Sequence, residues 1–347
     1  MNILEKIKIA EQEGTPFVAY KSPNVSDLTF IGQNTDELYL FTDFSDSGYV
    51  FAPFDNNEDA YILKPDIVCV QKIESTPVFK DKVDLNSNVD ENTQISHQQK
   101  VTAAVNTIKT TGLSKIVISR KEDLLIDDFD TIRIFNNLLN SYINAYVYLW
   151  YHPKVGMWMG ATPETLLNVE KGFFKTMSLA GTQAYKGDLH PKWGAKELEE
   201  QQMVSDFIKQ NLKNTVNDLC FSEVKTVKAG TLLHLKTKVT GALKKDKDLE
   251  KIIKLLHPTP AVCGLPKEDS KTYILENEGY HRSFYTGYLG VLNMNKKTSL
   301  FVNLRCFSIK NNKVCLYVGG GITKDSNPEK EWLETVAKSK TIKNVLI

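Results

Sequence analysis

Short apolar runs, separated by polar turns, mark the first 70 residues as a β-rich segment. The runs are FVAY (17–20), ELYLF (37–41), YVFAPF (49–54) and IVCV (67–70). Clusters of Asn, Asp, Ser and Gly such as DFSDSG lie between them, and these residues favour turns. Residues 74–94 are polar and have no regular period, which predicts a connector or a mobile loop.

Helical and strand patterns mix after residue 94. Apolar residues spaced three and four apart predict helices over 95–110, 128–143, 196–212, 249–257 and from 328 to about 344. Asn327 and Pro328 favour the N-cap and the first position of the last helix. Strands are predicted over 115–126, 145–153, 156–170 and 234–243, and three more β-runs over 291–322, joined by the turns NMNKK and KNNK.

Runs of strands separated by single helices indicate the fold class. They predict an α+β fold, a single large domain of layered, mainly antiparallel β-sheets flanked by helices. We expect residues 1–92 to be an amino-terminal β-rich part of the same domain as residues 93–347. The glycine-rich VGGGI (318–322) does not open a helix in a βαβ unit, so a dinucleotide-binding fingerprint is not supported.

Composition and charge exclude several classes of protein. With 41% hydrophobic and 24% charged residues, the 347-residue chain is typical of globular proteins. A net charge of +1 gives no reason to expect nucleic acid or anionic membrane as a partner. The first residues have no apolar signal-peptide core, and no apolar stretch is long enough to span a membrane. The five cysteines are scattered without a C-x-x-C pair, which predicts reduced core thiols in a cytoplasmic protein.

Two helices carry acidic residues on one face. Glu197 and Glu200 are three residues apart at the edge of an apolar stripe, and Glu331, Glu334 and Lys338 share a face of the last helix. Taken alone, each set predicts ordinary surface ion pairs, Lys196 with Glu200 and Glu334 with Lys338. Carboxylates from two helices would also suit Mg²⁺, which prefers octahedral oxygen ligands.

Four further residues have both a structural and a chemical interpretation. Lys115 opens the apolar strand KIVISR, where it either snorkels to solvent or is buried with a lowered pKa as a base. Glu164 follows Thr-Pro and either caps a turn or is a carboxylic acid kept protonated by an apolar site. Arg305, on an apolar strand, is suited to an internal salt bridge or to a substrate carboxylate. His257 precedes a proline and is more often a helix C-terminal cap than a catalytic group.

Taken in order, these segments resemble the chorismate-utilising family of isochorismate, salicylate, anthranilate and aminodeoxychorismate synthases. The matching blocks, spread over about residues 93–345, are KIVISR, GATPETLL, SLAGT, KELEEQQMV, LLHPTPAVCGLP, ENEGYHRSFYTGYLG, LRCFSIK, LYVGGGI and NPEKEWLETVAK. The resemblance implies the family's chorismate-binding fold, with residues 93–347 as its catalytic region.

The resemblance also implies roles for single residues. Lys115 is similar to the lysine that activates water, and Glu164 to the acid that protonates the departing C4 hydroxyl. Glu200 and Glu334 resemble the Mg²⁺ ligands, with Glu197 and Glu331 in the acidic shell around them. The residues that resemble the substrate-binding positions are Gly181, Thr182, His257, Tyr285, Arg305, Gly319, Gly321 and Lys338.

The implied activity is that of an Mg²⁺-dependent isochorismate synthase acting on chorismate. A salicylate synthase, which goes on to eliminate pyruvate, shares Lys115 and Glu164 and is the nearest alternative. An ammonia-using synthase is less favoured, because such members carry glutamine in place of Lys115. We therefore expect no glutaminase partner, and a monomer. The chain departs from the family pattern at Ser178, Gln201 and Gly320, and Gly320 is expected to loosen the substrate turn.

Overall fold

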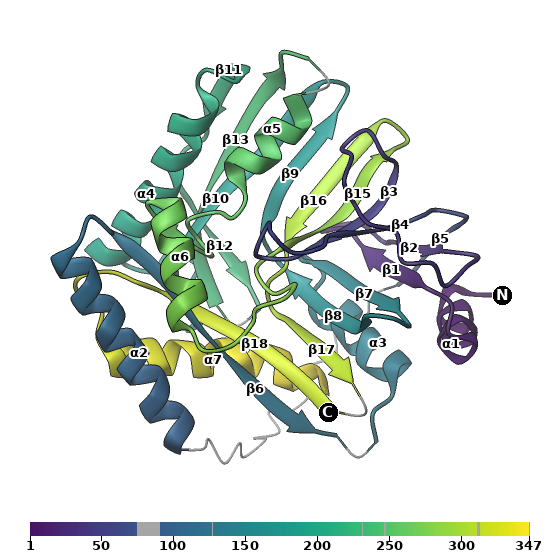
Figure 1. The fold of residues 1–347 in the computed structure, drawn as a ribbon, viewed down its shortest axis with the longest axis horizontal. Helices are drawn as coiled ribbons and strands as arrows, with labels where there is room; N and C mark the ends of the chain where they lie inside the picture. The colour runs from purple at the N-terminus through teal and green to yellow at the C-terminus, as the bar shows by residue number, and fades with distance from the viewer. Residues whose placement is uncertain (75–90, 127, 231, 246–247, 311–312, 347) are drawn as a thin grey trace.

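The computed structural model describes residues 1–74, 91–126, 128–230, 232–245, 248–310 and 313–346 (Figure 1). The helices in these residues are α1 (Ile3–Glu13), α2 (Glu91–Thr110), α3 (Thr131–Ser141), α4 (Ala195–Leu212), α5 (Asp248–Leu256), α6 (Lys267–Asn277) and α7 (Pro328–Leu346).

The strands fall into two antiparallel sheets. The first sheet has the order β14 (Gly264–Leu265), β6 (Lys115–Leu125), β18 (Lys313–Ile322), β17 (Cys306–Lys310), β8 (Gly156–Thr162), β7 (Tyr146–His152), β1 (Phe17–Lys21), β2 (Asp27–Gly32) and β5 (Ile67–Lys72). The second has the order β11 (Val216–Phe221), β13 (Leu232–Leu243), β10 (Phe173–Ala184), β9 (Thr165–Glu170), β16 (Lys297–Val302), β15 (Tyr288–Met294), β3 (Gly48–Ala52) and β4 (Tyr61–Leu63), with β12 (Lys225–Ala229) also paired to β13.

The sheets pack face to face through a layer of large aromatic side chains. Tyr146, Tyr148 and Trp150 of β7 meet Phe51 of β3 and Phe301 of β16 in one buried cluster. Helices α1, α3 and α7 cover the outer face of the first sheet, and α4 and α5 cover that of the second (Figure 1). The result is the layered, antiparallel α+β fold expected from the sequence, which is confirmed.

The amino-terminal strands contribute to both sheets. Strands β1, β2 and β5 extend the first sheet beyond β7, and β3 and β4 extend the second beyond β15. Phe17 and Val18 are fully buried, so this segment adds to the same cores as the rest of the chain.

Most of the predicted elements are confirmed, and one is wrong. The segment ELYLF (37–41) is not a strand, because only Leu40 forms an isolated bridge, to Tyr61. The patterns missed β2, β4, β10, β11, β12, β14 and α6. The predicted connector 74–94 lies mostly outside the described residues, and α2 begins at Glu91, within its range. The last helix begins as predicted, since Asn327 Oδ1 accepts from the Lys330 amide at 3.0 Å.

Two runs that look continuous in the sequence are each divided between the two sheets. The run 156–170 forms β8 in the first sheet and β9 in the second, with Pro163 and Glu164 at the crossing. The middle β-run of 291–322 forms β16 in the second sheet and β17 in the first, with Asn303–Arg305 at the crossing. Arg305 has φ +49°, a left-handed conformation that turns the chain there.

The glycines of VGGGI lie inside a strand, as the β-run predicted up to residue 322 required, and not in the substrate turn that was also expected there. Strand β18 pairs with β6 along its whole length, from Lys313 opposite Leu125 to Ile322 opposite Ile116. The turn before α7 follows at Thr323–Asn327.

All five cysteines are free thiols, as predicted, but they are not all in the core. Cys263 and Cys306 are buried, whereas Cys220 is exposed. Among the described helices, none has the length and apolar character needed to cross a membrane.

Candidate active site

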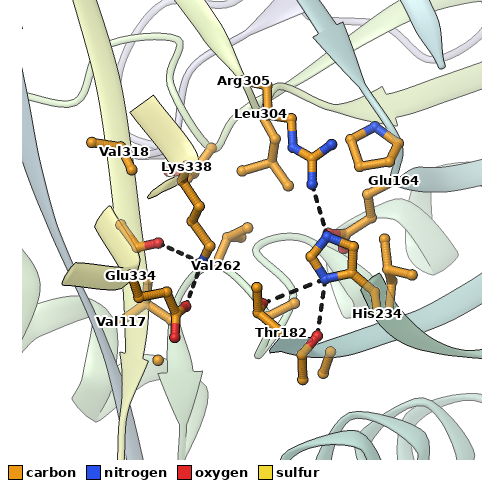
Figure 2. Close-up of a pocket in the computed structure, with 18 of the residues that line it drawn as sticks. Val117, Glu164, Thr182, His234, Val262, Leu304, Arg305, Val318, Glu334 and Lys338 are labelled. Carbon is orange, nitrogen blue, oxygen red and sulfur yellow. Dashed lines mark hydrogen bonds and ion pairs between the residues drawn. The ribbon is translucent and has the colours of Figure 1, made fainter. Parts of the chain in front are cut away.

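One pocket opens between the two sheets, beside the two crossings. It encloses about 850 Å³, including the space at its open mouth. In Figure 2, Val117, Val318, Glu334 and Lys338 lie on one side, from β6, β18 and α7, and Thr182 and His234 lie on the other, from β10 and β13. The lining residues are Lys115, Val117, Pro163, Glu164, Leu179, Ala180, Gly181, Thr182, Glu200, His234, Ala261, Val262, Tyr285, Thr286, Leu304, Arg305, Tyr317, Val318, Gly319, Gly321, Glu334, Lys338 and Ile342.

Lys115 enters the pocket from the first residue of β6. Its side chain is only 2% exposed, and burial lowers its pKa, with Glu200 opposing that shift and Lys338 adding to it. Side chains alternate along a strand, so Lys115 and Val117 reach the pocket on the same face. A neutral amine in this position has a free lone pair and can accept a proton.

Gly321 makes room for the Lys115 side chain. A Cβ built on Gly321 would lie 2.7 Å from Lys115 Cε and 3.2 Å from Nζ, closer than van der Waals contact allows. At the neighbouring Gly320 a Cβ would meet its nearest atoms, carboxylate oxygens of Glu331 and Glu334, at 3.4 and 3.6 Å, which is ordinary contact.

We expect Gly321→Ala to displace the Lys115 amine and lower turnover at least about tenfold, since small misplacements of a reacting group cost large factors in rate. Gly320→Ala is the matched control and should keep most of the activity. Steady-state kinetics with both variants measures the difference, and equal effects of the two substitutions would contradict this steric role.

Glu164 is held in the pocket by the crossing from β8 to β9. It is 3% exposed, and Thr259 Oγ1 donates to its Oε1 at 3.2 Å. Burial raises the pKa of this carboxyl to about 7, although the Thr259 hydrogen bond and Lys115 pull it down. A carboxyl with this pKa is partly protonated at neutral pH and can donate a proton.

Arg305 is fixed by a histidine that the sequence did not single out. His234 Nδ1 lies 2.9 Å from the Gly181 carbonyl, so it carries the proton, and Nε2 accepts from Arg305 Nη2 at 2.7 Å (Figure 2). Arg305 Nη1 also donates to the Ala229 carbonyl at 3.0 Å. Burial and the Arg305 charge lower the pKa of His234 to about 3, so the imidazole is neutral. Among the described residues, no carboxylate pairs with this guanidinium, which leaves its charge for an anionic ligand.

An acidic cluster from α4 and α7 lies at the Lys115 end of the pocket. Lys196 Nζ lies 2.5 Å from Glu331 Oε1 and 3.8 Å from Glu200 Oε1, so an ammonium bridges the two helices. Glu334 Oε1 pairs with Lys338 Nζ at 2.7 Å, and Lys338 also donates to the Gly319 carbonyl at 2.8 Å. Burial opposes ionisation of Glu334, but Lys338, together with Lys196 and Lys115, outweighs it and the pKa of this carboxyl is lowered.

The acidic cluster has the donor chemistry of a site for a hard divalent cation. Glu331 Oε2 is buried without a hydrogen-bond partner, which is costly unless a cation or water satisfies it. Carboxylate oxygens of Glu331 and Glu334 both face Gly320, since they are the atoms nearest to a Cβ built there. Among the described residues, no three acidic, histidine or cysteine side chains are already arranged around a metal position, and Lys196 and Lys338 pair with Glu331 and Glu334. The residues therefore fit Mg²⁺ if Lys196 moves aside.

The pocket brings together most of the residues singled out in the sequence. Those that line it are Lys115, Glu164, Gly181, Thr182, Glu200, Tyr285, Arg305, Gly319, Gly321, Glu334 and Lys338. Glu331 lies just behind the wall at Gly320. Glu197 does not line the pocket and packs against Gly181 and Gly194. His257 also lies outside it, where its Nε2 lies 3.1 Å from the Thr286 carbonyl.

Several lining residues could not be recognised from the sequence. His234 lies in a strand of alternating character, HLKTKV, and a lone histidine there gives no chemical signal. Tyr317, in β18, stacks on Tyr285 with ring centroids 5.4 Å apart, and a tyrosine within a strand pattern gives no sign of such a contact.

The family of the chain follows from a comparison with known proteins. A family model described as "Chorismate binding enzyme" matches residues 62–347. The chain belongs to the chorismate-binding enzyme family. Every residue that lines the pocket falls within this match, so the pocket is a property of the family's part of the chain.

Curated relatives of this chorismate-binding enzyme share about 30% of its residues. It is 29% identical to isochorismate synthase EntC of Escherichia coli (strain K12) over 264 residues, which cover 73% of this chain and 67% of that protein. It is 30% identical over 244 residues to the chloroplastic isochorismate synthase 2 of Arabidopsis thaliana, covering 66% of this chain and 43% of that protein. The matches thus span about half to two thirds of these relatives.

Solved structures share the fold over nearly the whole chain. The isochorismate synthase DhbC described from Bacillus anthracis superposes with a TM-score of 0.82 at 22% identity, covering 99% of both chains. The menaquinone-specific isochorismate synthase MenF of Escherichia coli gives a TM-score of 0.82 at 20% identity, covering 100% of this chain and 92% of that one. Anthranilate synthase component I of Streptococcus pneumoniae gives 0.69 at 18% identity, covering 94% and 89%. The fold therefore includes the amino-terminal strands that precede the family match.

Proposed function

We propose that this chorismate-binding enzyme is an isochorismate synthase that uses Mg²⁺. One observation supports this activity most directly. The same pocket holds a buried lysine whose pKa is lowered and a buried glutamic acid whose pKa is raised to about 7, which suits one base and one acid working at neutral pH. The relatives named as isochorismate synthases point to the same reaction.

The residues have a defined part in this reaction. The neutral amine of Lys115 takes a proton from a water molecule as its oxygen attacks C2 of chorismate. Both ring double bonds shift by one position, from C1=C2 to C1=C6 and from C5=C6 to C4=C5, and the bond between C4 and its hydroxyl oxygen breaks. Glu164 gives its proton to that oxygen, which leaves as water, so one water enters and one leaves. The overall change is an isomerisation.

Cationic side chains hold the anionic substrate in place. Chorismate carries two carboxylates, and the guanidinium of Arg305 would present a planar pair of N–H donors to one of them. Its protein partners, His234 and the Ala229 carbonyl, are neutral and leave its charge without a counter-ion. Glu200 and Glu334 would hold Mg²⁺, with Glu331 beside them, and the ion would supply positive charge against a substrate carboxylate as the C4–O bond breaks.

Product analysis tests the assignment. The purified protein should convert chorismate into isochorismate, with Mg²⁺ required. Accumulation of salicylate and pyruvate would instead assign the salicylate synthase reaction, and an amino product formed with ammonia would assign an ammonia-using synthase. No product under any of these conditions would contradict catalysis.

The metal assignment predicts a separate effect. We expect Glu334→Gln to weaken Mg²⁺ binding at least about tenfold, because a charged oxygen ligand is replaced by a neutral one. Titration of Mg²⁺ by calorimetry measures it, with Glu199→Gln as a control, an exposed carboxylate of α4 that does not line the pocket. Identical titrations of Glu334→Gln and the wild type would remove Glu334 from the ligand set.

A further inference from the structure

Behind the pocket wall lies a buried ion pair that the proposed reaction does not use. Arg282 and Glu278 are 3% and 1% exposed, one turn of chain apart after α6. Arg282 Nε donates to Glu278 Oε2 at 2.6 Å, and Nη2 donates to Oε1 at 2.7 Å, a two-bond fork that fixes the guanidinium plane.

The remaining donors of Arg282 reach three other segments of the chain. Nη2 donates to the Val117 carbonyl at 2.8 Å, and Nη1 donates to the Val262 carbonyl at 2.8 Å and to Thr286 Oγ1 at 3.2 Å. With the two bonds to Glu278, this uses all five N–H donors of a guanidinium. A lysine has only three donors on one nitrogen and cannot reproduce this planar arrangement.

The pair also completes an open sheet edge. Strand β14 pairs with β6 only at Lys115 and Ile116, and the Val117 amide donates to the Cys263 carbonyl at 2.7 Å. Beyond that point, no strand of the described residues follows on this side of β6. The Val117 carbonyl takes its bond from Arg282, and the Ser119 amide donates to Glu278 Oε1 at 2.7 Å. The side chains of Arg282 and Glu278 thus form the hydrogen bonds that a neighbouring strand would otherwise form, and buried backbone groups need such partners.

The three other segments that accept hydrogen bonds from Arg282 each contribute a residue to the lining of the pocket. Val117, Val262 and Thr286 all line it. Val117 is two residues after Lys115 on β6, and Val262 is three residues after Thr259, which donates to Glu164. Displacing these segments relative to one another would change the separation of the two proton-transfer groups.

We propose that Arg282 is a positioning residue for the isomerisation. Its bonds to Val117, Val262 and Thr286 fix the relative positions of the segments that place Lys115 and Glu164 in the pocket. The expected effect on kcat rests on the proposed function. The expected effect on the protection of these segments from hydrogen exchange does not. Arg282 lies behind the wall and does not touch the substrate space.

Kinetics of Arg282→Lys gives the first test. The variant keeps the charge opposite Glu278, and we expect kcat to fall about 10²-fold while KM for chorismate changes less than about threefold, since geometry and not binding is lost. Gln33→Met is the control, because this buried side chain also makes three backbone hydrogen bonds, far from the pocket. A loss in kcat no larger than that of the control, or a loss confined to KM, would overturn the inference.

Hydrogen exchange gives a second test that needs no activity. In Arg282→Lys, peptides containing residues 115–121 and 259–264 should exchange faster, while the same peptides in Gln33→Met should stay as protected as in the wild type. If Arg282→Lys does not fold, Thr286→Val replaces it, because that change removes the 3.2 Å bond from Arg282 Nη1 to Thr286 Oγ1 and keeps the buried pair of Arg282 with Glu278. Unchanged protection in these peptides would overturn the inference. If Arg282→Lys exchanges faster but the wild type makes no isochorismate, Arg282 still positions these segments and only the proposed function is rejected.

Discussion

Lys115→Met is expected to lower the rate of isochorismate formation by at least about 10²-fold, the usual cost of removing a general base. The substitution keeps an apolar chain of similar length in the buried channel beside Gly321, so packing is largely preserved. What is lost is the amine that takes the proton from the attacking water. Rate measurements at saturating chorismate and Mg²⁺ give kcat directly.

Lys21→Met is the matched control for this change. Lys21 is also a fully buried lysine, but its Nζ donates to the Ile143 carbonyl at 3.1 Å, away from the pocket. It should lower stability and leave kcat within about threefold of wild type, since distant structural changes rarely alter the chemical step. Retention of more than about 10% of wild-type turnover by Lys115→Met would exclude Lys115 as the base.

Glu164→Gln is expected to separate activity from stability. Glutamine has the shape of the protonated acid but no proton to give, so turnover should fall about 10²-fold or more. The same change removes a carboxylate that is costly to bury in its charged form, and the protein should become more stable at alkaline pH.

The sign of the stability effect follows from the pKa of Glu164. Burial raises it from 4.5 to about 7, so the folded protein holds a proton between these values that the unfolded chain has released. Stability from this group is therefore fully present below about pH 4.5 and is lost as pH rises through about 7. Glu164→Gln should match the wild type near pH 4.5 and exceed it at pH 8 by up to about 3 kcal/mol.

Thermal unfolding at several pH values tests the stability effect, and the pH profile tests the acid. In the wild type, kcat/KM should decline above about pH 7 as Glu164 loses its proton. It should also decline on the acid side as Lys115 gains a proton, because the amine is neutral only at pH values above its lowered pKa. A stability difference that is the same at pH 5 and pH 8 would show that Glu164 titrates normally. A kcat/KM that rises steadily beyond pH 8 would remove it as the acid.

Local sequence patterns place some residues of the site and not others. Lys115 could be placed because strand periodicity fixes which face it shares with Val117, and Glu334 and Lys338 because helix spacing puts them on one face. His234 and Arg282 could not, because their importance lies in partners 71 and 165 residues away along the chain, Arg305 and Val117. Local patterns contain no information on such contacts.

The sequence by itself determined the elements with strong periodicity, the mixed α+β class and, through the order of its motifs, the family. Only the tertiary structure decided where Glu164 and Arg305 go, because nothing in the runs 156–170 and 298–310 shows that each passes from one sheet to the other. It also decided that Lys196 lies between Glu200 and Glu331, and that Lys115 is 2% exposed and not snorkelling to solvent. Burial and the distance between charges are set by packing of remote segments, and these two quantities shift the pKa values on which the proposed chemistry depends.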